Sequence, residues 1–274
     1  MLLRDWLLPA NHDTLKNIAF PPVLLLDGGV STELEKKLSS SSSEAPAFVH
    51  RELWSSSLLL KAEGRAAVRK CHEDFLSAGV DIISTCTYQA HYMPLPGRDK
   101  DDDFRKSSLR LEDSVVDTML RDGVRLAREA IAKSGRNENS AYIAASIGSL
   151  GGALADGSEY TGRFGLSVEQ LAEFHRRKVR TLASEKPDLL AFETIPCLAE
   201  CEAILILLEE LANDDRMETP PAWLSLACSD GAHLNDGSML MNAVAKIDEM
   251  DPGAKLVHAV GINCCSLTNG ESIS

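Results

Sequence analysis

The sequence predicts an α/β fold with a parallel sheet and, within that class, a (β/α)₈ barrel of the TIM type with about six of its eight units present. Short apolar runs alternate with longer segments of helical period. The runs are apolar at consecutive positions, as expected of parallel strands that are covered on both faces. They span residues 23–29, 81–88, 142–149, 188–195, 222–229 and 256–264.

Polar residues at the ends of these runs favour the barrel over an open sheet. In a barrel the C-terminal ends of the strands converge on one mouth, whereas in a doubly wound sheet they spread along a line. The doubly wound sheet stays open as the alternative, because six runs are fewer than the eight strands of a barrel. The polar residues at the run ends are Asp27, Thr87, Ser149, Glu193, Ser229 and Cys264.

Four segments between the runs have one apolar face at helical spacing and are predicted to be helices. They cover 116–131, 168–182, 198–211 and 240–247. Ser167 precedes the second of them with Gln170 three residues later, which predicts a capping box. The low-complexity stretches 39–46 and 97–103 are expected to be loops. With no sign of a boundary, residues 1–274 are predicted to form a single domain.

Composition excludes several classes of function. The 274 residues carry a formal net charge of -13, which argues against a nucleic-acid or anionic-membrane partner. No apolar run reaches about 18 residues, so no transmembrane helix is expected, and the N-terminus does not read as a signal peptide. Seven cysteines in separate apolar elements do not form a disulfide scaffold. We therefore expect a cytoplasmic protein.

Two stretches could bind an amino acid. In "LLLDGGVSTELE", Gly28 and Gly29 let backbone N–H groups approach a carboxylate at a helix start, and Asp27 can accept from an ammonium group. The simpler interpretation is a tight turn with Asp27 as helix N-cap. In "DLLAFETIP", Glu193 needs a partner, because an unpaired buried carboxylate costs several kcal/mol. A substrate ammonium, an arginine or backbone donors would serve.

Other stretches give weaker signals. "STCTYQA" offers Thr85, Thr87 and Tyr88 as hydroxyls and an aromatic wall at the mouth. The glycine-rich segment 146–165 matches no phosphate-binding pattern and is expected to be a long loop over the mouth. Zinc prefers thiolates, but adjacent Cys264 and Cys265 cannot both face one way, so a buried, inert cysteine is the simpler interpretation. The remaining candidates are interpreted as core cysteines (Cys71, Cys201, Cys228) and satisfied, partly buried histidines (His72, His175, His258).

Five stretches in this order resemble the homocysteine S-methyltransferase family: "LLLDGGVSTELE", "AGVDIISTCTYQA", "LADGSEYTG", "LLAFETIP" and "AVGINC". The resemblance covers residues 23–265. It extends more loosely to betaine–homocysteine methyltransferases and to the homocysteine domain of cobalamin-dependent methionine synthases.

The resemblance implies a zinc-dependent barrel that moves a methyl group from S-methylmethionine or S-adenosylmethionine to the thiol of homocysteine, giving methionine. Asp27 and Glu193 would meet the ammonium group of homocysteine, and the N–H groups of Gly28, Gly29 and Val30 its carboxylate. Cys264 would be one zinc ligand. Zinc suits the task, because a free thiol with a pKa of about 8.5 is mostly protonated at neutral pH and coordination deprotonates it.

The family's second ligand motif, Gly-Gly-Cys-Cys, is absent from this sequence, together with the last two strands. We therefore expect a barrel that lacks its C-terminal units. A second hypothesis follows: an inactive truncated homologue or partial binding protein without a complete zinc site. A third is a metal-free barrel that uses Asp27 and Glu193 for acid/base chemistry on a small polar substrate.

Overall fold

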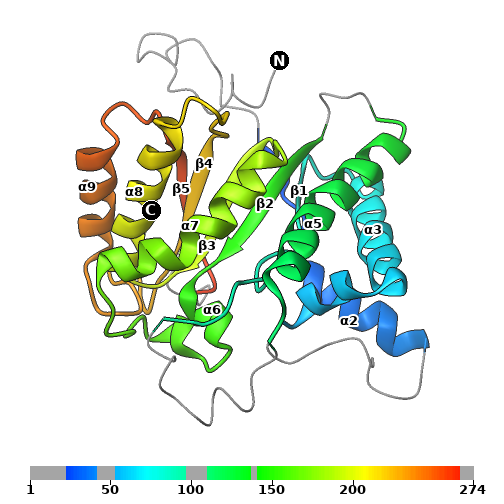
Figure 1. Ribbon diagram of the computed structural model, residues 1–274, viewed down its shortest axis with the longest axis horizontal. Coiled ribbons are helices and arrows are strands. Elements are labelled where there is room, and N and C mark those ends of the chain that lie inside the picture. Colours follow the sequence, from blue (N-terminus) through cyan, green and yellow to red (C-terminus); the bar gives the residue numbers. More distant parts are fainter. Residues whose placement is uncertain (1–22, 42–52, 97–109, 137–140, 266–274) are drawn as a thin grey trace.

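In the part of the chain that the structure describes, the sheet consists of five parallel strands paired in the order of the sequence (Figure 1). The computed structural model describes residues 23–41, 53–96, 110–136 and 141–265. Each strand pairs with its neighbours in the chain, so the five predicted strands after residue 80 are adjacent as well as consecutive. The strands are β1 (Ile82–Ser84), β2 (Tyr142–Gly148), β3 (Leu189–Ile195), β4 (Ala222–Ala227) and β5 (Val257–Asn263).

The first predicted strand is reduced to a single parallel bridge, Leu26 to Ile82. The backbone N–H of Asp27 donates to the carbonyl of Ile82 at 2.9 Å, and the N–H of Ile82 donates to the carbonyl of Leu25 at 3.0 Å. The run 23–29 therefore lies beside β1, where a first barrel strand belongs, although its pairing is too short to form a ladder.

The four predicted helices are confirmed, and α2 begins where a helix start was expected, but α3 and α6 were missed. Gln170 N–H donates to Ser167 Oγ and Ser167 N–H to Gln170 Oε1, so the capping box is present. Helix α3 escaped prediction because its buried face includes Gly64 and His72 and gives a weak apolar period. The helices are α2 (Val30–Ser41), α3 (Ala62–Ser77), α5 (Asp113–Lys133), α6 (Leu150–Leu154), α7 (Val168–Ser184), α8 (Leu198–Ala212) and α9 (Leu240–Met250), with 3₁₀ turns η2 (Ser55–Leu60) and η3 (Ser158–Tyr160).

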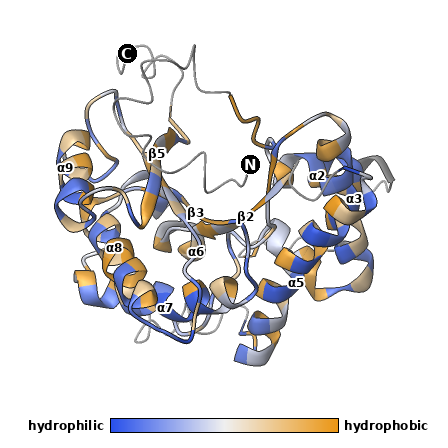
Figure 2. Ribbon diagram, turned by 90° about the horizontal axis from the view of Figure 1, so that it is seen from above, coloured by the Kyte–Doolittle hydropathy of each residue, from blue (hydrophilic) through white to orange (hydrophobic). Residues whose placement is uncertain are grey.

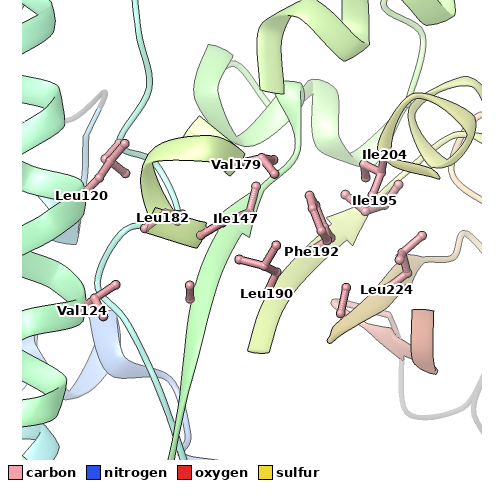
Figure 3. Close-up of a cluster of buried hydrophobic side chains, with 14 of the residues drawn as sticks. Leu120, Val124, Ile147, Val179, Leu182, Leu190, Phe192, Ile195, Ile204 and Leu224 are labelled. Atoms are coloured by element: carbon pink, nitrogen blue, oxygen red, sulfur yellow. The ribbon is translucent and has the colours of Figure 1, made fainter. Parts of the chain in front are cut away.

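The helices lie around the outside of a curved sheet, which favours the barrel over the doubly wound alternative (Figure 2). A doubly wound sheet would carry helices on both faces and reverse its strand order. Here the order is consecutive and the large core cluster lies between the sheet and α5, α7 and α8 (Figure 3). A second, smaller cluster of strand residues is separate from it: Ile82, Tyr142, Ala144, Leu189 and Ala191.

These two clusters follow the alternation of side chains along a strand. In β3, Leu190 and Phe192 belong to the large cluster, while Leu189 and Ala191 belong to the small one. The small cluster is therefore the inner face of the barrel. The fold is an α/β barrel type of which the described residues form an open arc.

Several smaller predictions have mixed outcomes. The prediction of a loop at 39–46 is wrong at its start, because α2 continues to Ser41. The rest of that stretch, the predicted loop at 97–103 and the N-terminal stretch lie outside the described residues. None of the helices in the described ranges is long and apolar enough to cross a membrane.

The core cysteines Cys71, Cys201 and Cys228 are buried as predicted. His175 is fully buried and only half satisfied: its Nε2 lies 2.8 Å from Glu200 Oε1, while its Nδ1 has no hydrogen-bond partner among the described residues. For His72 the expectation is wrong: it is fully buried, and neither ring nitrogen has a hydrogen-bond partner among the described residues. Burial lowers the pKa of His72 to about 4, so it stays neutral at physiological pH.

Candidate active site

The C-terminal ends of β1, β2, β3 and β5 open into a pocket of about 380 Å³. Its wall also includes the start of α2 and parts of η2 and η3. Three carboxylates line it (Asp27, Glu159 and Glu193), and no lysine, arginine or histidine is among its lining residues. A pocket with this charge pattern suits a ligand that carries a positive group.

The predicted convergence of strand ends holds for three of the six polar residues. Asp27, Glu193 and Cys264 line the pocket. The prediction is wrong for the other three, because neighbouring backbone groups take their hydroxyls. Thr87 Oγ1 donates to the carbonyl of Ser146, Ser149 Oγ accepts from Gly152 N–H, and Ser229 Oγ donates to the carbonyl of Leu234.

Asp27 is held by β1 and does not cap α2, so the N-cap interpretation is wrong. Its Oδ2 accepts from the backbone N–H of Ser84 at 2.8 Å, and its Oδ1 from Ser84 Oγ at 2.9 Å. Asp27 is only 7% exposed. Burial raises its pKa from 3.8 to about 7, the bonds from Ser84 oppose that rise, and the nearby charge of Glu193 adds to it.

Glu193 finds a neutral partner. Ser146 Oγ on β2 donates to Glu193 Oε2 at 2.6 Å. Burial raises the pKa of Glu193, while Ser146 and the charge of Lys178 lower it. Lys178 Nζ donates instead to the backbone carbonyls of Thr87 (2.9 Å) and Tyr88 (2.8 Å). The partner left open by the sequence is therefore a serine hydroxyl rather than an arginine.

The turn after Asp27 leads directly into α2 at the pocket wall. Gly28, Gly29 and Val30 all line the pocket, and the first helical bond runs from Glu33 N–H to the carbonyl of Gly29 at 3.0 Å. The N–H groups of a first helical turn have no partner within the helix. They can donate hydrogen bonds to an anionic group such as a carboxylate.

Cys264 is exposed at the pocket, so its interpretation as a buried, inert cysteine is wrong. Thr194 Oγ1 donates to Cys264 Sγ at 3.6 Å and accepts from Asn263 Nδ2 at 3.1 Å. Thr194 and Cys264 both have positive φ, 62° and 50°. Two strained residues facing each other are typical of functional sites. Neither positive φ angle is predictable from the sequence, because both residues are β-forming or apolar in type rather than glycine.

Tyr88 forms a wall of the pocket, as predicted. A Cβ on Gly148 or Gly152 would come within 2.8 Å or 2.7 Å of its ring, so both positions need glycine for the ring to fit. The glycine-rich segment is more ordered than the loop that was expected, since it contains α6 and η3. Through η3 it brings Glu159 and Tyr160 to the pocket.

The residues missed by the sequence analysis are mainly the two serines behind the carboxylates. Ser84 ends the apolar run "DII" and begins the hydroxyl-rich "STCTYQA", whereas Ser146 is a lone hydroxyl inside the apolar run "YIAASIG". A polar residue at an inward position near a strand end was the available signal. Together, the site offers carboxylates, the N–H groups of a helix start and an exposed thiol in one pocket. This arrangement can hold a small α-amino acid.

Known proteins are similar in sequence to this chain over most of its length. Homocysteine S-methyltransferase YbgG of Bacillus subtilis is 33% identical over 258 residues, which cover 92% of this chain and 72% of the relative. Homocysteine S-methyltransferase 2 of Zea mays is 39% identical, over 88% of this chain and 65% of the relative. The chain thus spans about two thirds to three quarters of the length of these relatives.

The fold is shared as well. The crystal structure of the metallated homocysteine methyltransferase MmuM from Escherichia coli superimposes with a TM-score of 0.73 at 32% identity, over 96% of this chain and 80% of that one. The family model described as homocysteine S-methyltransferase matches residues 24–273. The chain therefore belongs to the homocysteine S-methyltransferase family.

Proposed function

We propose that the protein transfers a methyl group from S-methylmethionine or S-adenosylmethionine to the thiol of homocysteine, giving methionine. The observation that carries the proposal is the pocket in which Asp27, Glu193 and Cys264 meet. Its carboxylates suit the ammonium group of an α-amino acid. Its exposed thiol suits a site that handles sulfur.

In this proposal, Asp27 and Glu193 bind the substrate ammonium group, and the N–H groups of Gly28, Gly29 and Val30 bind its carboxylate. Held at both groups, the amino acid has one direction left for its side chain, toward Cys264. The methyl donor carries its own positive charge and activation, so the chain needs no general acid. Its contribution is orientation, which can supply several kcal/mol of barrier lowering.

Zinc is the metal that we propose for this family site, with Cys264 as a ligand. Catalytic zinc sites use three protein ligands and keep a fourth position for substrate. Within the described residues, no group of three or more histidine, cysteine or carboxylate side chains could hold a metal. Cys264 thus fits one position, and the described residues do not supply a whole site. When bound, zinc would keep a substrate thiol deprotonated.

The test is a methyl-transfer assay with homocysteine and each donor, combined with zinc analysis of the same protein. Cys264→Ser should abolish turnover and lower bound zinc, whereas the neighbouring Cys265→Ser should leave both nearly unchanged. Full activity in Cys264→Ser would refute the proposal. Homocysteine binding without zinc or turnover would indicate a partial binding protein, and turnover that resists chelators would indicate acid/base chemistry by Asp27 and Glu193.

The cytoplasm is the compartment that we propose. All seven cysteines are free thiols, as expected in a reducing environment. The net charge of -13 supports small-molecule partners, homocysteine and a sulfonium donor, over nucleic acid or an anionic membrane surface.

A further inference from the structure

Ser84 and Ser146 stand directly behind the two carboxylates that face each other in the pocket. Ser84 donates twice to Asp27, from its backbone N–H and from its hydroxyl, at 2.8 and 2.9 Å. Ser146 donates to Glu193 Oε2 at 2.6 Å. Both serines also line the pocket. Each carboxylate is therefore fixed in orientation by a donor from a neighbouring strand.

Strand alternation explains why these hydroxyls meet the carboxylates. Residues two apart in a strand point to the same face. On β1, β2 and β3, a polar residue that lines the pocket lies two positions after a residue of the small apolar cluster inside the barrel. The polar residues thus form a layer just above the apolar interior of the barrel. The pairs are Ile82 and Ser84 on β1, Ala144 and Ser146 on β2, and Ala191 and Glu193 on β3.

Neutral donors orient a carboxylate without neutralising it. An arginine or lysine in place of either serine would pair with the carboxylate and compete with a positively charged ligand. The bond from Ser146 goes to Oε2 of Glu193, and Oε1 has no hydrogen-bond partner among the described residues. Asp27 uses one lone pair on each oxygen for Ser84, which leaves the others for a ligand. Both carboxylates are thus oriented by neutral hydrogen-bond donors, and each keeps acceptor sites for a ligand.

We propose that Ser84 and Ser146 are positioning residues that aim Asp27 and Glu193 at the ammonium group of the substrate and so set a preference for an α-amino acid. This inference rests on the proposed function. The substrate class that it names is a thiol that carries a free ammonium group. A thiol of the same length without that group should gain nothing from the two serines.

The test compares L-homocysteine with 4-sulfanylbutanoate, which has the same carboxylate, chain and thiol but no amino group. Dissociation constants for both are measured by calorimetry under reducing conditions, with the wild type, Ser146→Ala and Ser84→Ala. Ser146→Ala should weaken L-homocysteine binding roughly tenfold, as expected for losing a hydrogen bond to a charged group, and leave 4-sulfanylbutanoate unchanged. Ser84→Ala should have a smaller effect, since the backbone N–H still donates to Asp27.

A matched control is Ser225→Ala, which removes a strand hydroxyl from β4 outside the pocket lining and should change neither constant. If both ligands weaken equally in Ser146→Ala and Ser84→Ala, or neither changes, the positioning role is refuted. A wild type that binds both ligands equally also refutes it, while leaving the proposed function intact. A wild type that binds neither ligand refutes the proposed function itself. Thermal unfolding of each variant checks that it is folded.

Discussion

Asp27→Asn should make the protein more stable at pH 8, although it removes a binding residue. Burial raises the pKa of Asp27 from 3.8 to about 7. At 1.36 kcal/mol per pH unit, this difference corresponds to about 4 kcal/mol between the protonated and ionised forms. Asparagine resembles the protonated form, because its oxygen can accept from the Ser84 N–H and its amide can donate to Ser84 Oγ.

The direction of the pH effect follows from proton uptake. Between about pH 4 and 7 the unfolded carboxylate is ionised while the folded one stays protonated, so the folded state binds more protons. The free energy of unfolding therefore falls as pH rises through this window. The stability contributed by the protonated Asp27 is fully present below pH 3.8 and lost by about pH 7. Asp27→Asn should lack this fall, with a gain over wild type of up to about 4 kcal/mol at pH 8.

The assay is urea denaturation of wild type and Asp27→Asn at pH 4.5, 6 and 8, followed by circular dichroism. Asp248→Asn is the control, since Asp248 is exposed on α9. A difference that does not grow with pH, or a variant less stable than wild type at pH 8, would contradict the reasoning. The same variant should bind L-homocysteine poorly, because its amide cannot offer a negative charge. Stability and function are then traded at one residue.

Three further changes test the surroundings of the site. Burial lowers the pKa of Lys178 from 10.5 to about 7, so the free energy of unfolding of the wild type should fall as pH decreases from about 10 to 7. In urea titrations, Lys178→Met should make the free energy of unfolding depend less on pH over this range. The variant should also be less stable overall, because the carbonyls of Thr87 and Tyr88 lose their hydrogen-bond donor. His72→Leu should raise stability at pH 7 by on the order of 1 kcal/mol, seen as a higher Tm, because it removes two buried ring nitrogens without partners; an unchanged or lower Tm contradicts this. Thr194→Val should cost about 2 kcal/mol by urea titration and Thr194→Ser much less, since serine keeps the hydroxyl that bonds Asn263 Nδ2 and Cys264 Sγ; equal losses would place the effect in packing instead.

The sequence predicted the elements well and the site in part, for reasons that can be traced to particular residues. Val116 to Ile131 carry a clear helical period because one face of α5 packs on the core. The adjacency of Asp27 and Glu193 also followed from their place at strand ends. Side-chain partners could not be predicted, because Ser84 and Ser146 meet carboxylates 57 and 47 residues away through sheet pairing.

The negative charge of the pocket carboxylates has to be balanced by a cation that the ligand brings. Asp27 and Glu193 both have pKa values raised by burial, so each carboxylate is costly to ionise in the folded protein. The buried amine behind them does not remove that cost, because Lys178 donates to two backbone carbonyls and its own pKa is lowered. Ser84 and Ser146 orient the carboxylates but leave their charge. An arriving ammonium group supplies the missing cation, so a ligand that carries one should stabilise the folded protein by mass action while a ligand that lacks it should do so far less.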